Sequence, residues 1–262
     1  MRFTKMQGLG NDFMLVRSQV PGDVSPLCRR LCDRHFGIGA DGVIFVSPSR
    51  VADGSMRIFN ADGSEAKMCG NGIRCVGKYL YEKGLVPKDR MMVETLSGVK
   101  ALTLTVEDQQ VERVSVDMGR AVLEQAEAPL PDGLGPGMLI SVGNPHLVIF
   151  SDTVEDLPLS LWGPWIESDP RFPGGVNVEF VQVLAPEQLR MRVWERGCGV
   201  TLACGTGACA SAFAAVQAGL CPAGRPIEVV LDGGSLRVTV SAEGDLSMAG
   251  PAVTVFEGEV DL

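Results

Sequence analysis

The chain has 262 residues, of which 45% are hydrophobic and 21% charged. This composition is typical of folded globular proteins and unlike that of disordered chains. The length exceeds what most single hydrophobic cores hold, so two domains are expected. The formal net charge of −9 argues against a protein that binds nucleic acid or an anionic membrane through its overall charge.

The sequence favours a cytoplasmic protein. Its apolar runs fall short of the roughly 18–20 residues that a membrane-spanning helix needs, and its N-terminal segment lacks a secretory apolar region. The eight cysteines are then expected to be mostly free thiols, because that compartment is reducing. No Cys-x-x-Cys pair occurs, and His35 and His146 lie far apart in the sequence, so no metal site is expected.

Predicted elements in the first half begin with a charged stretch that is expected to be helical. This stretch covers residues 28–35. Three runs rich in residues that favour β-strands follow it, at 42–47, 56–60 and 92–106. A second helix is predicted to begin just after Cys69-Gly70, because apolar residues recur from Ile73 to Leu80 at helical spacing. Gly84 is expected to end this helix.

The second half repeats this order. Its predicted β-rich runs lie at 138–150, 189–195 and 227–240, and its predicted helix at about 206–218 is apolar all round. A helix without a polar face is expected to be enclosed on every side.

Matching segments at a spacing of 135 positions support a duplication. The pairs at this spacing are Met56-Arg57-Ile58-Phe59 with Met191-Arg192-Val193-Trp194, Cys69-Gly70-Asn71-Gly72 with Cys204-Gly205-Thr206-Gly207, and Gly84-Leu85-Val86-Pro87 with Gly219-Leu220-Cys221-Pro222. With a slip of two residues, Gly10-Asn11 also corresponds to Gly143-Asn144.

We therefore expect an α+β protein of two pseudo-symmetric lobes. Each lobe would be a strongly curved, mostly antiparallel, barrel-like sheet around a central helix. The lobes are expected at 1–119 and 120–250, with 251–262 returning to the first lobe and the active site in the cleft between them. The stretch 129–137, rich in Pro and Gly, is an alternative place for the junction.

Two cysteines stand at equivalent helix starts, Cys69 and Cys204. The positive end of a helix favours a thiolate and lowers its pKa below the free value of about 8.5, and the glycines that follow expose N–H groups to a carboxylate. Two such thiols on opposite faces of one carbon suit inversion of an amino-acid stereocentre. The remaining cysteines are expected to be structural: Cys28, Cys32, Cys75, Cys198, Cys209 and Cys221.

No cofactor is expected. The stretch Gly37–Gly42 matches a dinucleotide-binding pattern, but it follows a predicted helix and precedes a strand, which is the reverse of the order that such a site needs. No phosphate-binding Gly-rich loop with Lys and Ser/Thr occurs, and nothing marks a lysine as a pyridoxal site.

The chain resembles the diaminopimelate epimerase family over essentially its whole length. The resemblance is carried, in order, by Gly8-Leu9-Gly10-Asn11-Asp12-Phe13, Asn60-Ala61-Asp62-Gly63-Ser64-Glu65, Met68-Cys69-Gly70-Asn71-Gly72-Ile73-Arg74, Gly143-Asn144-Pro145-His146, Glu195-Arg196-Gly197 and Ala203-Cys204-Gly205-Thr206-Gly207. It implies conversion of LL- to meso-diaminopimelate without a cofactor, in lysine and peptidoglycan biosynthesis, by a homodimer.

The resemblance also implies roles for single residues. Cys69 and Cys204 would be the catalytic acid and base, and His146 and Glu195 would tune their pKa values. The carboxylate at the reacting centre would be held by Gly70, Asn71, Gly205 and Thr206. The rest of the substrate would be bound by Asn11, Asn60, Asn144, Asn177, Glu195 and Arg196.

Three positions depart from the family pattern. Gly42 stands where some members carry Gln, Val200 replaces an acidic residue, and Phe256 stands where the dimer contact is often Tyr. A proline or hydroxyproline racemase of the same superfold is disfavoured, because it usually carries His at the position of Asn71. A phenazine-type isomerase lacks the cysteine pair. A non-catalytic amino-acid-binding or redox-sensing protein is the remaining alternative.

Overall fold

In the computed structural model, which describes residues 1–128, 130 and 134–261, the chain divides into two compact units. Met1–Asp117 and Gly250–Leu262 form the first unit, and Met118–Ala249 forms the second. Part of the Pro/Gly-rich stretch considered as a junction, residues 129 and 131–133, lies outside the described residues. None of the described helices is long and apolar enough to cross a membrane.

The first unit is a curved mixed sheet with one helix inside it and one outside. Its elements are β1 (Arg2–Gly8), β2 (Asn11–Arg17), α1 (Ser25–Cys32), β3 (Gly42–Ser47), β4 (Gly54–Asn60), β5 (Glu65–Ala66), α2 (Gly70–Glu82), β6 (Arg90–Thr95), β7 (Gly98–Glu107), most of β8 (Gln110–Arg120) and β18 (Val253–Glu259).

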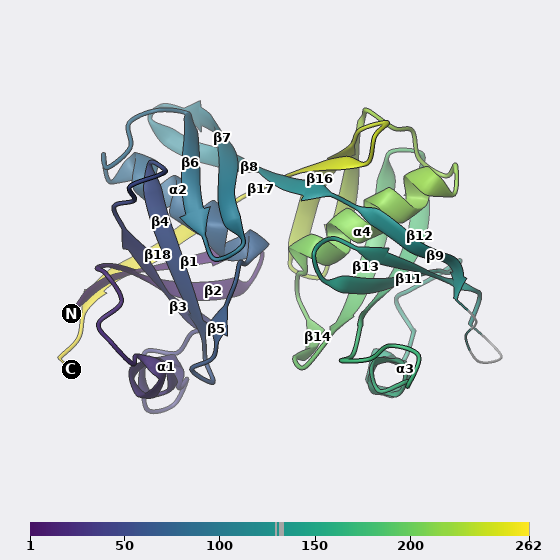
Figure 1. The fold of residues 1–262 in the computed structure, drawn as a ribbon, viewed down its shortest axis with the longest axis horizontal. Helices are drawn as coiled ribbons and strands as arrows, with labels where there is room; N and C mark the ends of the chain where they lie inside the picture. Colours follow the sequence, from purple (N-terminus) through teal and green to yellow (C-terminus); the bar gives the residue numbers. More distant parts are fainter. Residues whose placement is uncertain (129, 131–133, 262) are drawn as a thin grey trace. The chain divides into compact units, whose positions relative to one another are not determined.

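Strands of this unit pair in the order β18–β1–β2–β3–β4–β6–β7–β8, and β5 adds to β4. The pairs β2/β3 and β4/β6 are parallel, and the others are antiparallel. Helix α2 contacts β1, β2, β4 and β7, so the sheet wraps around it (Figure 1). Every residue of α2 from Gly70 to Val76 is buried, so the first two turns have no face exposed to solvent.

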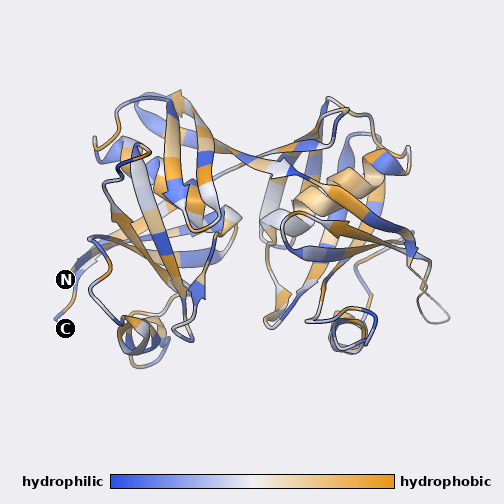
Figure 2. Ribbon diagram, in the orientation of Figure 1, coloured by the Kyte–Doolittle hydropathy of each residue, from blue (hydrophilic) through white to orange (hydrophobic). Residues whose placement is uncertain are grey.

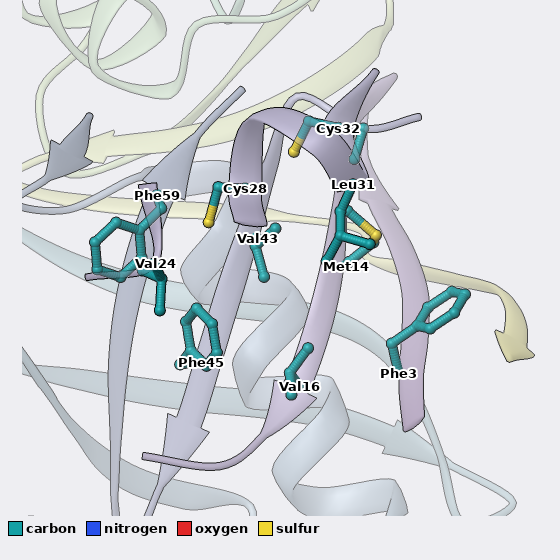
Figure 3. Close-up of a cluster of buried hydrophobic side chains, with 11 residues drawn as sticks. Phe3, Met14, Val16, Val24, Cys28, Leu31, Cys32, Val43, Phe45 and Phe59 are labelled. Carbon is teal, nitrogen blue, oxygen red and sulfur yellow. The ribbon is translucent and has the colours of Figure 1, made fainter. Parts of the chain in front are cut away.

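Helix α1 covers the opposite face of the same strands. Alternate residues along a strand point to opposite faces, so Val43 and Phe45 of β3 pack toward α1 while Ile44 lies against α2. Leu31 and Cys28 of α1 join this cluster (Figure 3). Burial raises the pKa of the Cys28 thiol to about 11, as expected for a structural cysteine.

The second unit repeats the order of the first, element by element. Its elements are β9 (Val122–Ala128), β10 (Gly137–Ser141), β11 (Pro145–Phe150), α3 (Leu159–Glu167), β12 (Asn177–Ala185), β13 (Gln188–Glu195), β14 (Gly199–Thr201), α4 (Gly205–Gln217), β15 (Pro226–Leu231), β16 (Gly234–Val240) and most of β17 (Asp245–Gly250).

Strand pairing in this unit follows the same plan. The order is β9–β10–β11–β12–β13–β15–β16–β17, with β14 on β13, and the parallel pairs are β11/β12 and β13/β15. Helix α4 contacts β10, β11, β12, β13, β15 and β16 and is apolar along most of its length (Figure 2). Its residues from Gly207 to Ala215 are all buried, which confirms the prediction of an enclosed helix.

The expected fold class is therefore confirmed: two α+β units, each a mostly antiparallel curved sheet around a helix. Both central helices begin directly after a cysteine, and α2 ends before Gly84, whose φ is +64°. The run predicted at 138–150 is two strands, because a turn at 142–144 reverses the chain. Helix α3 was not predicted, because its mixture of Leu, Trp, Gly and Pro lacks a clear helical period.

Candidate active site

Cys69 is the N-cap residue of α2. Its backbone is extended (φ −140°), which turns the sulfur back over the first helical turn. There Sγ accepts a hydrogen bond from the N–H of Gly72 at 3.4 Å, and the thiol donates to Asn11 Oδ1 at 3.7 Å. A Cβ at position 72 would lie 2.9 Å from Cδ1 of Ile44, so a glycine allows this turn to lie directly on β3.

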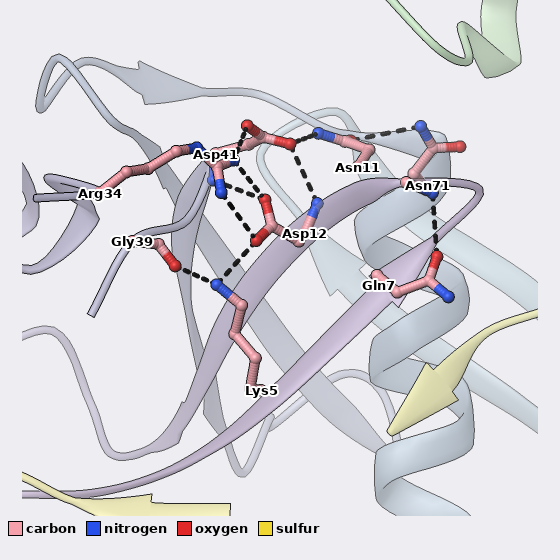
Figure 4. A network of polar contacts seen from close by, with 9 residues as sticks. Lys5, Gln7, Asn11, Asp12, Arg34, Gly39, Asp41 and Asn71 are labelled. Atoms are coloured by element: carbon pink, nitrogen blue, oxygen red, sulfur yellow. Dashed lines mark hydrogen bonds and ion pairs between the residues drawn. The ribbon is translucent and has the colours of Figure 1, made fainter. Parts of the chain in front are cut away.

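A polar network fixes the amide of Asn11 (Figure 4). Its Nδ2 donates to Asp41 Oδ2 at 2.7 Å, and its Oδ1 accepts from Asn71 Nδ2 at 3.2 Å. Because Asp41 only accepts, the amide nitrogen must face it and the amide oxygen must face Cys69. The structure thus brings Cys69, Asn11 and Asn71, three of the residues singled out in the sequence, into contact with one another.

Asp12 anchors the same network from behind. Burial alone would raise its pKa, but hydrogen bonds and charges from Arg34 and Lys5 prevail and lower the pKa from 3.8 to about 2. Lys5 Nζ lies 2.7 Å from Asp12 Oδ2, and Arg34 bridges Asp12 and Asp41 at 2.7 and 2.8 Å. These ion pairs hold Asp41 in place beneath Asn11.

Asn60 and Gly42 face each other at the ends of β4 and β3. The Asn60 side chain, expected to bind the rest of the substrate, is exposed and donates to Ser64 Oγ at 3.0 Å, within its own loop. At Gly42, a Cβ would lie 2.6 Å from the carbonyl oxygen of Phe59. This register therefore requires a glycine at position 42.

Cys204 repeats the arrangement of Cys69 at the start of α4. Its Sγ accepts from the N–H of Gly207 at 3.3 Å and lies 3.5 Å from Thr206 Oγ1. Asn144 Nδ2 donates to the same Thr206 oxygen at 3.5 Å. Asn144 and Thr206 stand where the first unit has Asn11 and Asn71, so each cysteine lies beside a corresponding pair of polar side chains from its own unit.

Two carboxylates distinguish the surroundings of Cys204. Glu195, at the end of β13, accepts from Thr201 Oγ1 at 2.5 Å, and burial raises its pKa. Glu179, in β12, lies with its Oε1 2.6 Å from the position of a Cβ at Gly207. His146, predicted to tune the cysteines, bonds through Nδ1 to Glu179 Oε1 at 2.7 Å and through Nε2 to Asn144 Oδ1 at 3.1 Å.

The expectation of a lowered thiol pKa is wrong for Cys204. Burial, followed by the charges of Glu195 and Glu179, raises its pKa well above the usual value, and these effects outweigh the hydrogen bonds from Thr206 and Gly207. The helix N-terminus therefore does not dominate here, and Cys204 rests as a protonated thiol.

Asn177 and Arg196 form a separate corner of the second unit. Asn177 Nδ2 donates to the Pro145 carbonyl at 2.9 Å, and its Oδ1 accepts from the Arg196 N–H at 3.1 Å. The exposed Arg196 guanidinium donates to the carbonyls of Gly174 and Gly175 at 3.1 and 3.3 Å. A planar cation held in this way is suited to a carboxylate. Val200 is half-exposed on β14, where an acidic residue would face solvent.

Sequence reasoning did not single out Asp41 or Glu179. Asp41 lies within the Gly-rich stretch that we considered only as a nucleotide motif, and Glu179 is the one charged residue in the run Asn177–Val183. A lone carboxylate in an apolar strand is a signal for a buried polar partner, which here is His146. Among the described residues, no three His, Cys, Asp or Glu side chains gather as metal ligands.

Comparisons with known proteins agree with the resemblance seen in the sequence. A family model described as diaminopimelate epimerase matches residues 3–124 and 138–255. The chain is 50% identical over 277 residues to a protein named diaminopimelate epimerase from Pelotomaculum thermopropionicum, covering 99% of this chain and 98% of that protein.

Two solved structures share the fold. A hydroxyproline epimerase from Agrobacterium vitis with bound trans-4-OH-L-proline matches with a TM-score of 0.76 at 17% identity, covering 98% of this chain and 91% of that one. A phenazine biosynthesis protein from Bacillus anthracis matches with a TM-score of 0.78 at 17% identity, covering 100% and 99%. At such identities these similarities concern the fold alone.

Proposed function

The chain belongs to the diaminopimelate epimerase family, and we propose that it interconverts LL- and meso-2,6-diaminopimelate with Cys69 and Cys204 as acid and base, without a cofactor. The observation that carries this proposal is the duplicated N-cap cysteine. Each copy of the unit places one thiol at the start of its buried central helix, with a glycine N–H on the sulfur.

Inversion of a stereocentre needs proton removal from one face and delivery to the other. In the proposed reaction, one thiolate takes the Cα proton, the electron pair of the broken C–H bond moves toward the α-carboxylate, and the other thiol gives its proton to the opposite face. The two sulfurs end with their protonation states exchanged. N–H groups in the first turn after each cysteine, at Gly70, Asn71, Gly205 and Thr206, would stabilise the charge that develops on the carboxylate.

The resting protonation of Cys204 supports a starting assignment. Its buried surroundings and the carboxylates of Glu195 and Glu179 keep the thiol protonated. A turnover would therefore begin with Cys204 as the proton donor and Cys69 as the acceptor. The reverse reaction would begin from the form that this turnover leaves, with Cys204 as the thiolate and Cys69 as the thiol.

Recognition of the rest of the substrate is proposed for polar groups outside the two cysteine turns. The Arg196 guanidinium is suited to the distal carboxylate, and the oxygens of Glu195 and of the asparagine side chains are suited to the distal ammonium. The proposed residues are Asn11, Asn60, Asn144, Asn177, Glu195 and Arg196.

Isotope exchange tests the proposal directly. Reduced protein, incubated in heavy water with LL-diaminopimelate and no added cofactor, is expected to incorporate deuterium at one Cα and to form the meso isomer, both followed by mass spectrometry and chiral chromatography. Binding of diaminopimelate without exchange would leave only an amino-acid-binding protein. Racemisation of proline in a parallel reaction would instead favour the racemase alternative.

We also infer a cytoplasmic homodimer that uses the outer surface of β18. This strand exposes Val253, Val255 and Phe256. The ring of Phe256 packs edge-to-face against that of Phe3, with the ring centroids 5.8 Å apart. Sedimentation of the wild type as a dimer, and of Phe256→Asp as a monomer, is the expected outcome. A monomeric wild type would contradict this inference.

A further inference from the structure

Glu179 and His146 form a fully buried pair beneath the start of α4. Neither side chain has any exposed surface, and Nδ1 of His146 lies 2.7 Å from Oε1 of Glu179. The carboxylate reaches this position because β12 alternates its faces: Val178 and Phe180 pack in the cluster beneath α3, while Glu179 points toward Gly207 of α4.

A buried carboxylate is costly unless a counter-charge and hydrogen bonds compensate it. Within the part of the chain that the structure describes, the second oxygen of Glu179, Oε2, has no hydrogen-bond partner. The contact between Oε1 and His146 must therefore compensate the cost of burying this carboxylate. The other ring nitrogen, Nε2, faces an acceptor, Asn144 Oδ1, at 3.1 Å. Each ring nitrogen of His146 thus lies within hydrogen-bond distance of an oxygen, and an imidazole donates to two oxygens only when both of its nitrogens carry a proton.

We propose that Glu179 is a positioning residue that sets the direction of a hydrogen-bond relay ending on the sulfur of Cys204. The cationic His146 donates to the oxygen of the Asn144 amide, so the amide nitrogen faces Thr206 and donates to Oγ1 at 3.5 Å. The Thr206 oxygen thereby accepts from Asn144, so the Thr206 hydroxyl is free to donate its own hydrogen to Cys204 Sγ, 3.5 Å away.

The direction of the relay matters for the reaction, because a donor to sulfur stabilises the thiolate that Cys204 becomes after giving up its proton. If His146 were neutral and lacked the Nε2 proton, the Asn144 amide would turn to present its nitrogen to the ring. The Asn144 oxygen would then accept a hydrogen bond from the Thr206 hydroxyl, and Thr206 would no longer donate to the sulfur.

The first unit shows that the fold itself does not need this pair. Phe13 and Ile44 occupy the equivalent positions: Phe13 pairs with Gly42 as His146 pairs with Asn177, and Ile44 and Glu179 each stand two residues further along their strands. An apolar pair fills this space in one copy and an ionic pair in the other. Glu195, the other charged group close to Cys204, is not a member of the relay: it accepts from Thr201 Oγ1 and contacts the Cys204 thiol directly.

Nuclear magnetic resonance can test the relay without relying on activity, because the chain has only two histidines. In protein labelled with ¹⁵N-histidine, the ring nitrogens of His146 are expected to show the doubly protonated form at neutral pH. The exposed His35 serves as the internal reference. In Glu179→Gln, which keeps the shape but not the charge, His146 is expected to show the singly protonated form, and in Glu179→Asp the doubly protonated form.

The kinetic arm rests on the proposed function, whereas the spectroscopic arm does not. Glu179→Gln is expected to lower kcat by about tenfold with diaminopimelate, with kcat in Glu179→Asp restored to within about threefold of the wild type. A singly protonated His146 in the wild type, or an unchanged ring in Glu179→Gln, would overturn the proposal. If Glu179→Gln does not fold, the wild-type and Glu179→Asp spectra decide it. A wild type inactive on diaminopimelate would reject the proposed function, while the protonation state of His146 would still decide the relay.

Discussion

Ile44 in β3 and Glu179 in β12 occupy equivalent positions, each directly beneath the third residue of a helix that begins after a cysteine. A Cβ on Gly72 would lie 2.9 Å from Ile44 Cδ1, and a Cβ on Gly207 would lie 2.6 Å from Glu179 Oε1. The two copies thus share one packing arrangement with different chemistry. In the first the neighbouring atom is the terminal methyl group of Ile44, and in the second it is a carboxylate oxygen that is bonded to His146.

Alanine at these two glycines is expected to have unequal effects. In Gly72→Ala, the end of Ile44 can move aside, and the better helix propensity of alanine offsets much of the cost, so the free energy of unfolding should change by less than about 1 kcal/mol. In Gly207→Ala, Glu179 cannot move without breaking its bond to His146, so a loss of about 2–3 kcal/mol is expected. Denaturant unfolding measures both, and equal losses would contradict the argument.

Each N-cap cysteine is expected to be essential on its own. Cys69→Ala and Cys204→Ala should each lower the rate of inversion by at least about a thousandfold, because each removes the proton carrier of one face. Chiral chromatography of the product measures this rate.

Cys75→Ala is the matched control for these variants. This cysteine is buried in α2, where burial raises its pKa to about 12. Its loss should cost about 1–2 kcal/mol of stability and leave turnover near that of the wild type. Substantial inversion by either N-cap variant would reject the two-thiol reaction.

Asp41→Asn tests whether the orientation of the Asn11 amide matters. An asparagine at 41 can present its own nitrogen to Asn11, which removes the reason for the Asn11 oxygen to face Cys69. We expect kcat/KM to fall by about tenfold. Arg34→Gln is the control, because it removes the ion pair on Asp41 Oδ1 and leaves the hydrogen bond that Asp41 Oδ2 accepts from Asn11. A similar loss in both variants would show that only the ion pairs matter.

Asp12 makes stability depend on pH in the acid range. Its pKa is about 2 in the folded protein against 3.8 for the free group, so its contribution is complete above about pH 4 and is lost as the pH falls through 2. Asp12→Asn should lower the free energy of unfolding by on the order of 1–2 kcal/mol at pH 7.

The difference between wild type and Asp12→Asn should therefore narrow between pH 4 and pH 2, as measured by urea unfolding at several pH values. Asp152→Asn, at an exposed position, should show no such narrowing. A gap that stays constant down to pH 2 would mean that Asp12 does not stabilise the fold through its charge.

Spacing along the chain was enough to predict the duplicated architecture. Repeated motifs such as Cys69-Gly70 and Cys204-Gly205 mark helix starts, because an N-cap and a following glycine are local requirements of the backbone. The apolar character of 206–218 predicted a buried helix for the same kind of local reason: a helix with no polar face must be enclosed. The candidate cysteines came from these local motifs, whereas the roles expected of the asparagines came from the resemblance to the family.

Folding in three dimensions was needed to find the partners that orient these groups. Asp41 reaches Asn11 across 30 positions of chain, and Glu179 reaches His146 across 33. A strand pattern shows which residues share a face, but not which side chain from another strand stands beside them. The same applies to the Cys204 thiol: its helix N-terminus suggested a lowered pKa, whereas burial beside two carboxylates, which depends on packing alone, raises it.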